Sequence, residues 1–296
     1  MERLCESEGM NQNTTVTPGR YTAFTTDPGG GNPAGVVLDA AGLGTEDMAA
    51  LAADLGYSET AFVTAGDADR HRFTVRYFSP LSEVDFCGHA TIATAVALAE
   101  ETGPGEITLD TRVGEIPVLT GTDPDGNLRA TLTSVATRSR PARDAELDEA
   151  LAALGWGRDD LDRELPPHVA FGGVHHLVLA AATRERLADL SYDFDGLAAV
   201  MRRHGWATLQ LVVRENPALF HARDPFPVGG VVEDPATGAA AAALGGYLRT
   251  LGLVPEGGTV TVRQGEDMGS PSTLTVDIDL DDPRVRVSGH AVRLPG

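Results

Sequence analysis

Residues 85–91 read DFCGHAT, and residues 233–238 read EDPATG in the second half of the chain. Each stretch follows a strand pattern that ends in a proline-containing turn, at 76–80 and at 223–227, and each precedes an alanine-rich segment. Two copies of strand, loop and helix start indicate an internal duplication. Such a duplication would place the two loops opposite each other across a cleft that suits a small ligand.

The alanine-rich segments, IATAVAL at 92–98 and AAAAAL at 239–244, carry small or apolar residues on nearly every helical face. A helix of that composition is buried on all sides. The pattern therefore predicts an α+β fold of two pseudo-symmetric halves, each a curled, mostly antiparallel sheet around one central helix.

Local signals set the expected boundaries. Polar residues 1–19 predict a leader without regular structure. The N-terminal half is expected at 20–137, completed by a strand at 285–296, and the C-terminal half at 138–284. The polar stretch from Arg138 to Arg143 is interpreted as an inter-domain linker, and the helix from Thr45 to Gly56 is given Thr45 as its N-cap. Further expected elements are helices at 90–101, 183–190 and 195–204 and strands at 60–64, 71–78, 106–110, 115–119, 127–133, 174–180 and 207–213.

Composition excludes several classes of function. The 296 residues carry 43 acidic and 23 basic side chains, a net charge of −20, and every basic residue is Arg. Without Lys there is no lysine Schiff base and no Walker-type phosphate loop. The acidic balance opposes binding to nucleic acid or to an acidic membrane surface. No apolar run approaches the roughly 20 residues of a bilayer span.

The number and spacing of the cysteines indicate the cellular compartment and limit the metal sites that the chain can form. Cys5 and Cys87 are the two cysteines of the chain, which excludes a disulfide framework and favours a reducing compartment. We therefore expect a cytoplasmic protein. No CxxC motif or Cys/His spacing suggests structural zinc, and no metal is predicted. Cys87 is interpreted as a small buried filler, and the absence of a cysteine at 230–240 rules out a two-thiol racemase.

Glu59 follows the first predicted helix and precedes an apolar strand. Burial at that junction would raise its pKa and make it a proton shuttle, although a solvated loop glutamate is the commoner case.

Gly88 and His89 open the first buried helix, where free N–H groups can hold a carboxylate. His89 is a proton donor or anchor in that interpretation, and a satisfied core histidine in the alternative. Asp234 before Pro235 is typical of a helix N-cap, which does not exclude a role facing the substrate. Thr237 and Gly238 offer small groups at the second helix mouth, and Tyr77, Asn32 and Arg223 are further polar candidates.

Five segments together resemble the phenazine-biosynthesis PhzF-like family. They are GNPAGV at 31–36, SET at 58–60, CGHAT at 87–91, EDPATG at 233–238 and QGEDMGSPS at 264–272, and the similarity runs from about Tyr21 to the end. The resemblance implies the diaminopimelate-epimerase fold, a homodimer and a cofactor-independent isomerase. In the best-understood member the reaction is the isomerisation of trans-2,3-dihydro-3-hydroxyanthranilate.

The resemblance also implies roles for single residues. Glu59 would shuttle the proton, while His89 and Asp234 hold and polarise a small anionic substrate. Its binding residues would be Ser58, Gly88, Tyr77, Thr237, Gly238 and Ala239. The chain departs from the family at Ala239, where a serine is usual, and at Ser270, where an arginine is frequent.

Two other functions stay open at this point. Glu59 opposite Asp234 or His89 could form the two acid/base groups of an amino-acid or hydroxy-acid epimerase. A binding protein that has lost catalysis is the second alternative, and Ala239 is the residue that favours it.

Overall fold

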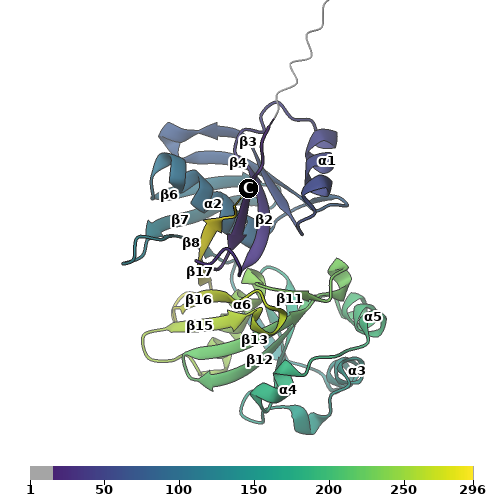
Figure 1. Cartoon of the computed structure of the whole chain (residues 1–296). Coiled ribbons are helices and arrows are strands. Elements are labelled where there is room, and N and C mark those ends of the chain that lie inside the picture. The colour runs from purple at the N-terminus through teal and green to yellow at the C-terminus, as the bar shows by residue number, and fades with distance from the viewer. Residues whose placement is uncertain (1–15, 296) are drawn as a thin grey trace, which may run out of the picture.

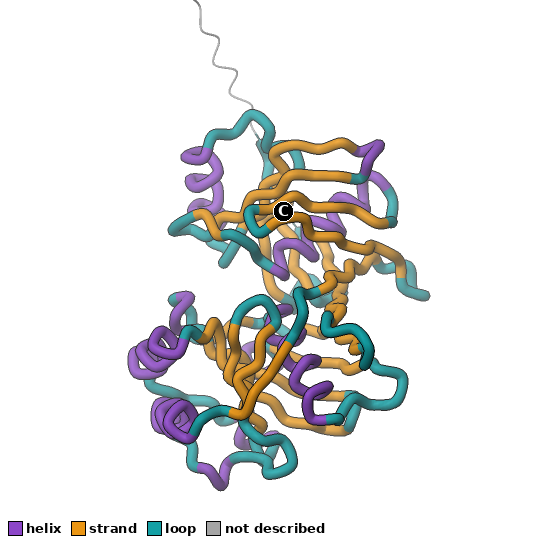
Figure 2. Tube along the Cα trace, turned by 180° about the vertical axis from the view of Figure 1, so that it is seen from behind, coloured by secondary structure: helices purple, strands orange, loops and turns teal. Residues whose placement is uncertain are grey.

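The computed structural model describes residues 16–295 and contains a 17-stranded sheet that forms two lobes (Figure 1). Most of the expected leader lies outside the described residues, and Gly19 already begins the first strand. In both lobes the sheet curls around a helix, as the view from behind also shows (Figure 2). The predicted fold class is confirmed.

The N-terminal lobe is a closed barrel around helix α2 (Gly88–Thr102). Strand pairing runs β1-β2-β3-β4-β6-β7-β8-β17 and returns to β1. Helix α1 (Thr45–Leu55) lies outside the barrel, and β5 (Glu83–Val84) pairs with the end of β4. The barrel strands are β1 (Gly19–Ala23), β2 (Asn32–Val37), β3 (Thr60–Asp67), β4 (Arg72–Phe78), β6 (Glu106–Thr111), β7 (Gly114–Thr122), β8 (Leu128–Thr133) and β17 (Val285–Arg293).

The C-terminal lobe repeats this order around helix α6 (Gly238–Leu251). Its strands are β9 (Arg138–Pro141), β10 (His168–Phe171), β11 (His175–Ala180), β12 (Trp206–Asn216), β13 (Leu219–Pro225), β14 (Glu233–Asp234), β15 (Thr259–Gln264) and β16 (Ser272–Ile278). Helices α3 (Asp144–Leu154), α4 (Arg184–Ala188) and α5 (Phe194–His204) pack outside.

Matching connections relate the two lobes. An antiparallel hairpin opens each one, β1 with β2 and β10 with β11. The second hairpin strand then pairs in parallel with the next strand, β2 with β3 and β11 with β12. The buried helix follows a short strand, β5 or β14, and connects a second parallel pair, β4 with β6 and β13 with β15. The faint sequence repeat therefore corresponds to a repeat in topology.

Strand β17 belongs to both lobes. Its first residues pair with β16 on one edge and with β8 on the other, and its last residues pair with β1. The closed N-terminal barrel and the curled C-terminal sheet thus share one continuous strand.

Both central helices are enclosed because their side chains are small. Residues 89–99 of α2 and 240–248 of α6 are all buried. Gly245 shows how tight this packing is, since an added Cβ would lie 3.0 Å from Val285 Cγ1. The narrow alanine-rich helix fits a barrel that a leucine-rich helix would overfill.

Three local predictions were wrong. The expected linker at 138–143 contains β9, which pairs with β10 because the backbone around Pro141 faces an edge where an N–H is dispensable. Gly44, rather than Thr45, is the N-cap of α1, and its N–H bonds to Asp47. Thr237, rather than Asp234, is the N-cap of α6, because Asp234 is held in β14.

Among residues 16–295, no helix is long and apolar enough to cross a membrane. The homodimer and the cytoplasmic location stay predictions.

Candidate functional site

The N-termini of the two central helices meet one cavity. Gly88 begins α2 and Gly238 begins α6, and both line a cavity of about 510 Å³ between the lobes. Neither N-cap side chain makes a capping hydrogen bond. The first N–H groups of both helices are therefore available to an anion.

Packing within the protein does not require glycine at either helix start. A Cβ added at Gly88 would have no neighbour within 4 Å, and one added at Gly238 would lie 3.6 Å from Phe24 Cζ. Both positions instead leave the backbone open to a bound molecule.

Glu59 lies beside the start of α2 together with Cys87 and His89. The Cys87 Sγ is 3.5 Å from Glu59 Oε2 and 3.4 Å from His89 Nδ1. His89 Nε2 is 3.5 Å from the same Glu59 oxygen. The Glu59 side chain is 20% exposed and that of His89 is 7% exposed. Glu59 is therefore a half-buried carboxyl with partners, not a solvated loop glutamate.

Ser58 completes this first cluster. Its Oγ lies 3.3 Å from His89 Nε2, so the hydroxyl and the Glu59 carboxyl both approach one nitrogen of the imidazole. The three ligand-type atoms of Glu59, Cys87 and His89 lie within 4.8 Å of one another, and they form the candidate metal-binding group of the described residues.

Cys87 is buried as expected, but it is more than a filler. Burial raises the pKa of its thiol well above the usual value, and the charge of Glu59 adds to this effect. The thiol is therefore protonated at neutral pH and donates to the Glu59 carboxylate. Sequence reasoning missed this contact because Glu59 reaches Cys87 from a different segment.

Asp234 forms a second cluster at the start of α6. Its Oδ1 accepts a 2.8 Å hydrogen bond from Asn32 Nδ2, and its Oδ2 accepts a 2.6 Å bond from the Thr237 hydroxyl. Gln264 Nε2 donates to the Asp234 carbonyl at 2.7 Å, and its Oε1 accepts from the Thr237 N–H at 3.1 Å. Gln264 was not predicted as a site residue, although its segment was part of the family resemblance.

The two clusters influence each other electrostatically. Burial raises the pKa of Asp234, the charge of His89 opposes that rise, and the charge of Glu59 adds to it. The charges of Glu59 and His89 in one lobe thus act on Asp234 in the other, although these residues come from segments far apart in the chain.

Away from the helix starts, the cavity is largely apolar. Ala239 lies on its wall beside Gly238. The remaining apolar side chains of the lining are Phe24, Phe86, Val113, Ile116, Leu132, Val135, Val174, Ala242 and Val287. The cavity thus combines two helix N-termini with an apolar body.

Two other candidates have structural partners. Tyr77 is fully buried, and its hydroxyl lies 2.7 Å from Thr91 Oγ1 within the barrel. Arg223 forms a two-bonded ion pair with Glu233, at 2.9 and 2.6 Å. Asn32, by contrast, donates a hydrogen bond to Asp234 and so links the two lobes.

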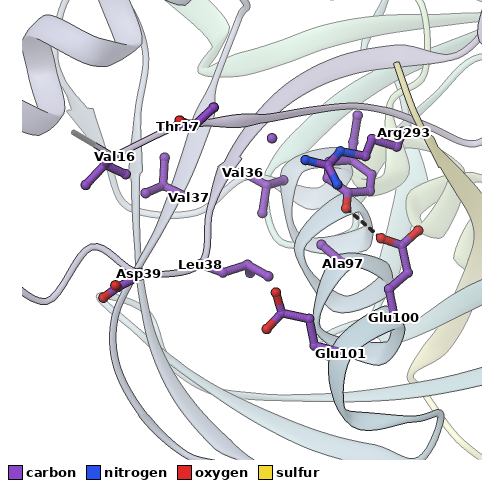
Figure 3. Close-up of a pocket in the computed structure, with 12 residues that line it drawn as sticks. Val16, Thr17, Val36, Val37, Leu38, Asp39, Ala97, Glu100, Glu101 and Arg293 are labelled. Carbon is purple, nitrogen blue, oxygen red and sulfur yellow. Dashed lines mark hydrogen bonds between the residues drawn. The ribbon is translucent and has the colours of Figure 1, made fainter. Parts of the chain in front are cut away.

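A second cavity, of about 460 Å³, lies at the opposite end of the N-terminal barrel (Figure 3). Ala97, Glu100 and Glu101 line it from the last turns of α2, and the Tyr21 hydroxyl donates to Glu100 at 2.7 Å. Because the candidate site lies at the first turn of α2, this cavity is separate from it.

Comparisons with known proteins agree with this architecture. The family model for phenazine biosynthesis-like proteins matches residues 21–295. An uncharacterized isomerase of Deinococcus radiodurans is 37% identical over 89% of this chain and 87% of its own. The trans-2,3-dihydro-3-hydroxyanthranilate isomerase of Pseudomonas aeruginosa is 32% identical over 90% of this chain and 93% of its own.

Solved structures show the same fold. A PhzF-family phenazine biosynthesis protein of Bacillus anthracis superposes with a TM-score of 0.82 at 26% identity, over 95% of this chain and 97% of its own. A hydroxyproline epimerase of Agrobacterium vitis, at 11% identity, shares the fold with a TM-score of 0.62 over 95% of this chain and 91% of its own. The match over nearly the whole chain places this protein in the phenazine biosynthesis-like (PhzF) family.

Proposed function

We propose that the protein is a cofactor-independent isomerase that moves a proton within a small carboxylate substrate. The observation that carries the proposal is the position of Glu59 beside the α2 N-terminus, close to His89 and to Asp234 of the other lobe. Relatives named as isomerases support the same reaction class.

The substrate carboxylate binds at the helix starts. Gly88 and Gly238, the first residues of α2 and α6, both line one cavity, and the positive ends of two helix dipoles favour an anion there. Apolar walls exclude water and hold the rest of the molecule. This arrangement suits a small acid with an unsaturated or apolar body.

Glu59 removes the proton from one carbon and returns it to another on the same face. One carboxyl is sufficient when the substrate is held in place and bulk water is excluded. His89, next to the cavity-lining Gly88, and Asp234, four residues before the cavity-lining Gly238, hydrogen-bond the substrate and stabilise the charge that develops during transfer.

The test is proton NMR in heavy water. Wild-type protein and E59Q are incubated with trans-2,3-dihydro-3-hydroxyanthranilate and with a panel of α-amino and β-hydroxy acids. E256Q, a change at an exposed loop glutamate, serves as the matched control. We expect conversion that E59Q abolishes and E256Q retains, while all three proteins show the same unfolding temperature.

The other outcomes separate the alternatives. Deuterium entering the α-carbon of an amino acid, with inversion of configuration, would replace the isomerase by an epimerase. Binding of panel members without exchange, equally strong in E59Q, would favour a non-catalytic binding protein. Full turnover by E59Q would remove Glu59 from the mechanism.

A further inference from the structure

Glu59, Cys87 and His89 present three different metal-ligand atoms in one small volume. Glu59 comes from the loop between α1 and β3, Cys87 is the N-cap of α2, and His89 lies in the first turn. Sγ and Oε2 are 3.5 Å apart, Oε2 and His89 Nε2 are 3.5 Å apart, and Sγ and Nε2 are 3.8 Å apart. The three atoms therefore form a nearly equilateral triangle.

The dimensions of that triangle are those of a tetrahedral zinc site. Zn–S bonds of about 2.3 Å with Zn–N and Zn–O bonds of about 2.0–2.1 Å separate the ligand atoms by roughly 3.3–3.6 Å. The observed separations exceed this range by 0.2 Å at most, for Sγ and Nε2 at 3.8 Å. Because Sγ lies closer to His89 Nδ1, at 3.4 Å, than to Nε2, metal binding requires the imidazole to turn about its Cβ–Cγ bond until the Nε2 lone pair faces the other two ligands.

The ligand set also fits zinc chemically. Thiolate, imidazole and carboxylate are its preferred donors, and three protein ligands leave a fourth position for water or another molecule. Gly88, the residue between Cys87 and His89, lines the large cavity. Binding of Zn²⁺ displaces the proton of the Cys87 thiol to solvent, and the resulting thiolate and the Glu59 carboxylate together neutralise the divalent cation. The charge of Asp234 also acts on Cys87 and adds further negative potential.

We propose that these three side chains bind Zn²⁺ reversibly and that the bound ion inhibits the enzyme. The inhibitory part rests on the function proposed above, because zinc would occupy the Glu59 oxygen that accepts the proton. The Ser58 hydroxyl, now 3.3 Å from His89 Nε2, would give up that contact to the metal.

Cobalt substitution tests the site without any turnover. Co²⁺ bound by a thiolate gives a near-ultraviolet charge-transfer band, and tetrahedral Co²⁺ gives intense visible bands. We expect one equivalent of Co²⁺ to produce both in the wild-type protein, and Zn²⁺ to abolish them. The chain has two cysteines, so C5S is the matched control for C87A.

The variants decide between supporting and contradicting results. Loss of the near-ultraviolet band in C87A, with the band retained in C5S, supports the site. E59Q, at a partly exposed position, should weaken Co²⁺ binding by at least about tenfold without affecting folding. No band in the wild-type protein, or a band that C5S abolishes, would overturn the proposal.

The activity assay separates this proposal from the function. If Zn²⁺ inhibits turnover by both the wild-type protein and C5S, and a chelator reverses the inhibition, the result supports the metal site and the isomerase function. Cobalt binding without turnover of any substrate would support the metal site and contradict the isomerase proposal. Turnover without cobalt bands would support the isomerase proposal and contradict the metal site.

Discussion

Asp224 and Asp234 lie directly opposite each other where β13 pairs with β14. Asp224 is completely buried, and its Oδ1 accepts a 3.0 Å hydrogen bond from the Thr208 hydroxyl. Within residues 16–295 its Oδ2 has no hydrogen-bond partner. His176 Nδ1 lies 2.8 Å from the same Thr208 oxygen, so a buried polar chain extends inward from the candidate site.

D224N should stabilise the protein as the pH rises. Burial, reinforced by the charge of Asp234, raises the pKa of Asp224 well above its usual value. The folded state therefore keeps a proton that the unfolded chain releases above about pH 4, and stability falls by up to about 1.4 kcal/mol per pH unit. D224N removes this loss and can still accept from Thr208. Urea unfolding at pH 5 and 7.5 should show an advantage over wild type that grows with pH.

D224A is the control for that experiment, because it removes the acceptor of Thr208 and leaves a cavity. It should destabilise the protein at both pH values. A D224N effect that is the same at both pH values would show that Asp224 is ionised in the folded state.

H176N should act in the opposite direction. Burial lowers the pKa of His176 to about 3. The unfolded chain binds a proton there below about pH 6.5 and the folded state does not, so stability falls as the pH drops through this window, by up to about 1.4 kcal/mol per unit. H176N abolishes this fall.

Between about pH 4 and pH 6.5 the slopes of His176 and Asp224 have opposite signs and largely cancel. Denaturation curves should therefore show a steeper acid loss in D224N than in wild type, and a shallower one in H176N. Equal slopes in all three proteins would contradict the assignment of both residues.

Exchanging Asn32 and Asp234 should reveal the contact between the lobes. N32D replaces the donor of the 2.8 Å bond by a second carboxyl that repels Asp234, and should cost about 2 kcal/mol or more. N32D/D234N restores an amide opposite a carboxyl, so the double variant should recover part of the loss. The free energy of unfolding is the measurement, and strictly additive losses would show that the pair is not coupled.

G88A should raise KM without affecting stability. A Cβ at Gly88 would have no neighbour within 4 Å among residues 16–295, and it would lie at the helix start that binds the substrate carboxylate in the proposed function. We expect a KM increase of about tenfold, a weakening of roughly 1.4 kcal/mol, with an unchanged unfolding temperature. G42A, at another glycine where a Cβ would have no neighbour within 4 Å, should have wild-type KM and stability. A wild-type KM in G88A would place the carboxylate elsewhere.

The elements that could be predicted from sequence are those with a local signature. The composition of 92–98 and 239–244 indicated enclosed helices, and both are buried on every side. The linker prediction failed for the converse reason. The exposed β9 has a polar sequence and a proline, and what makes it a strand is a partner some 30 residues away along the chain, β10.

The candidate site was predictable residue by residue but not as an arrangement. Glu59 was identified from its position between a helix and an apolar strand, and His89 from its position at a helix start, whereas the Asn32 bond to Asp234 joins residues 202 positions apart. The buried chain from His176 through Thr208 to Asp224 left no sequence signal. Its members face one another through strand register, which only the closed sheet determines.

The sharing of β17 also constrains how the chain can fold during synthesis. The N-terminal barrel needs this strand between β8 and β1, yet the ribosome makes it only after the entire C-terminal lobe. Until β17 is made, β1 and β8 each have an unpaired edge, and one strand of the sheet that encloses α2 is missing. The N-terminal barrel therefore closes only after the C-terminal lobe has been made, in one late step that pairs residues near the two ends of the chain.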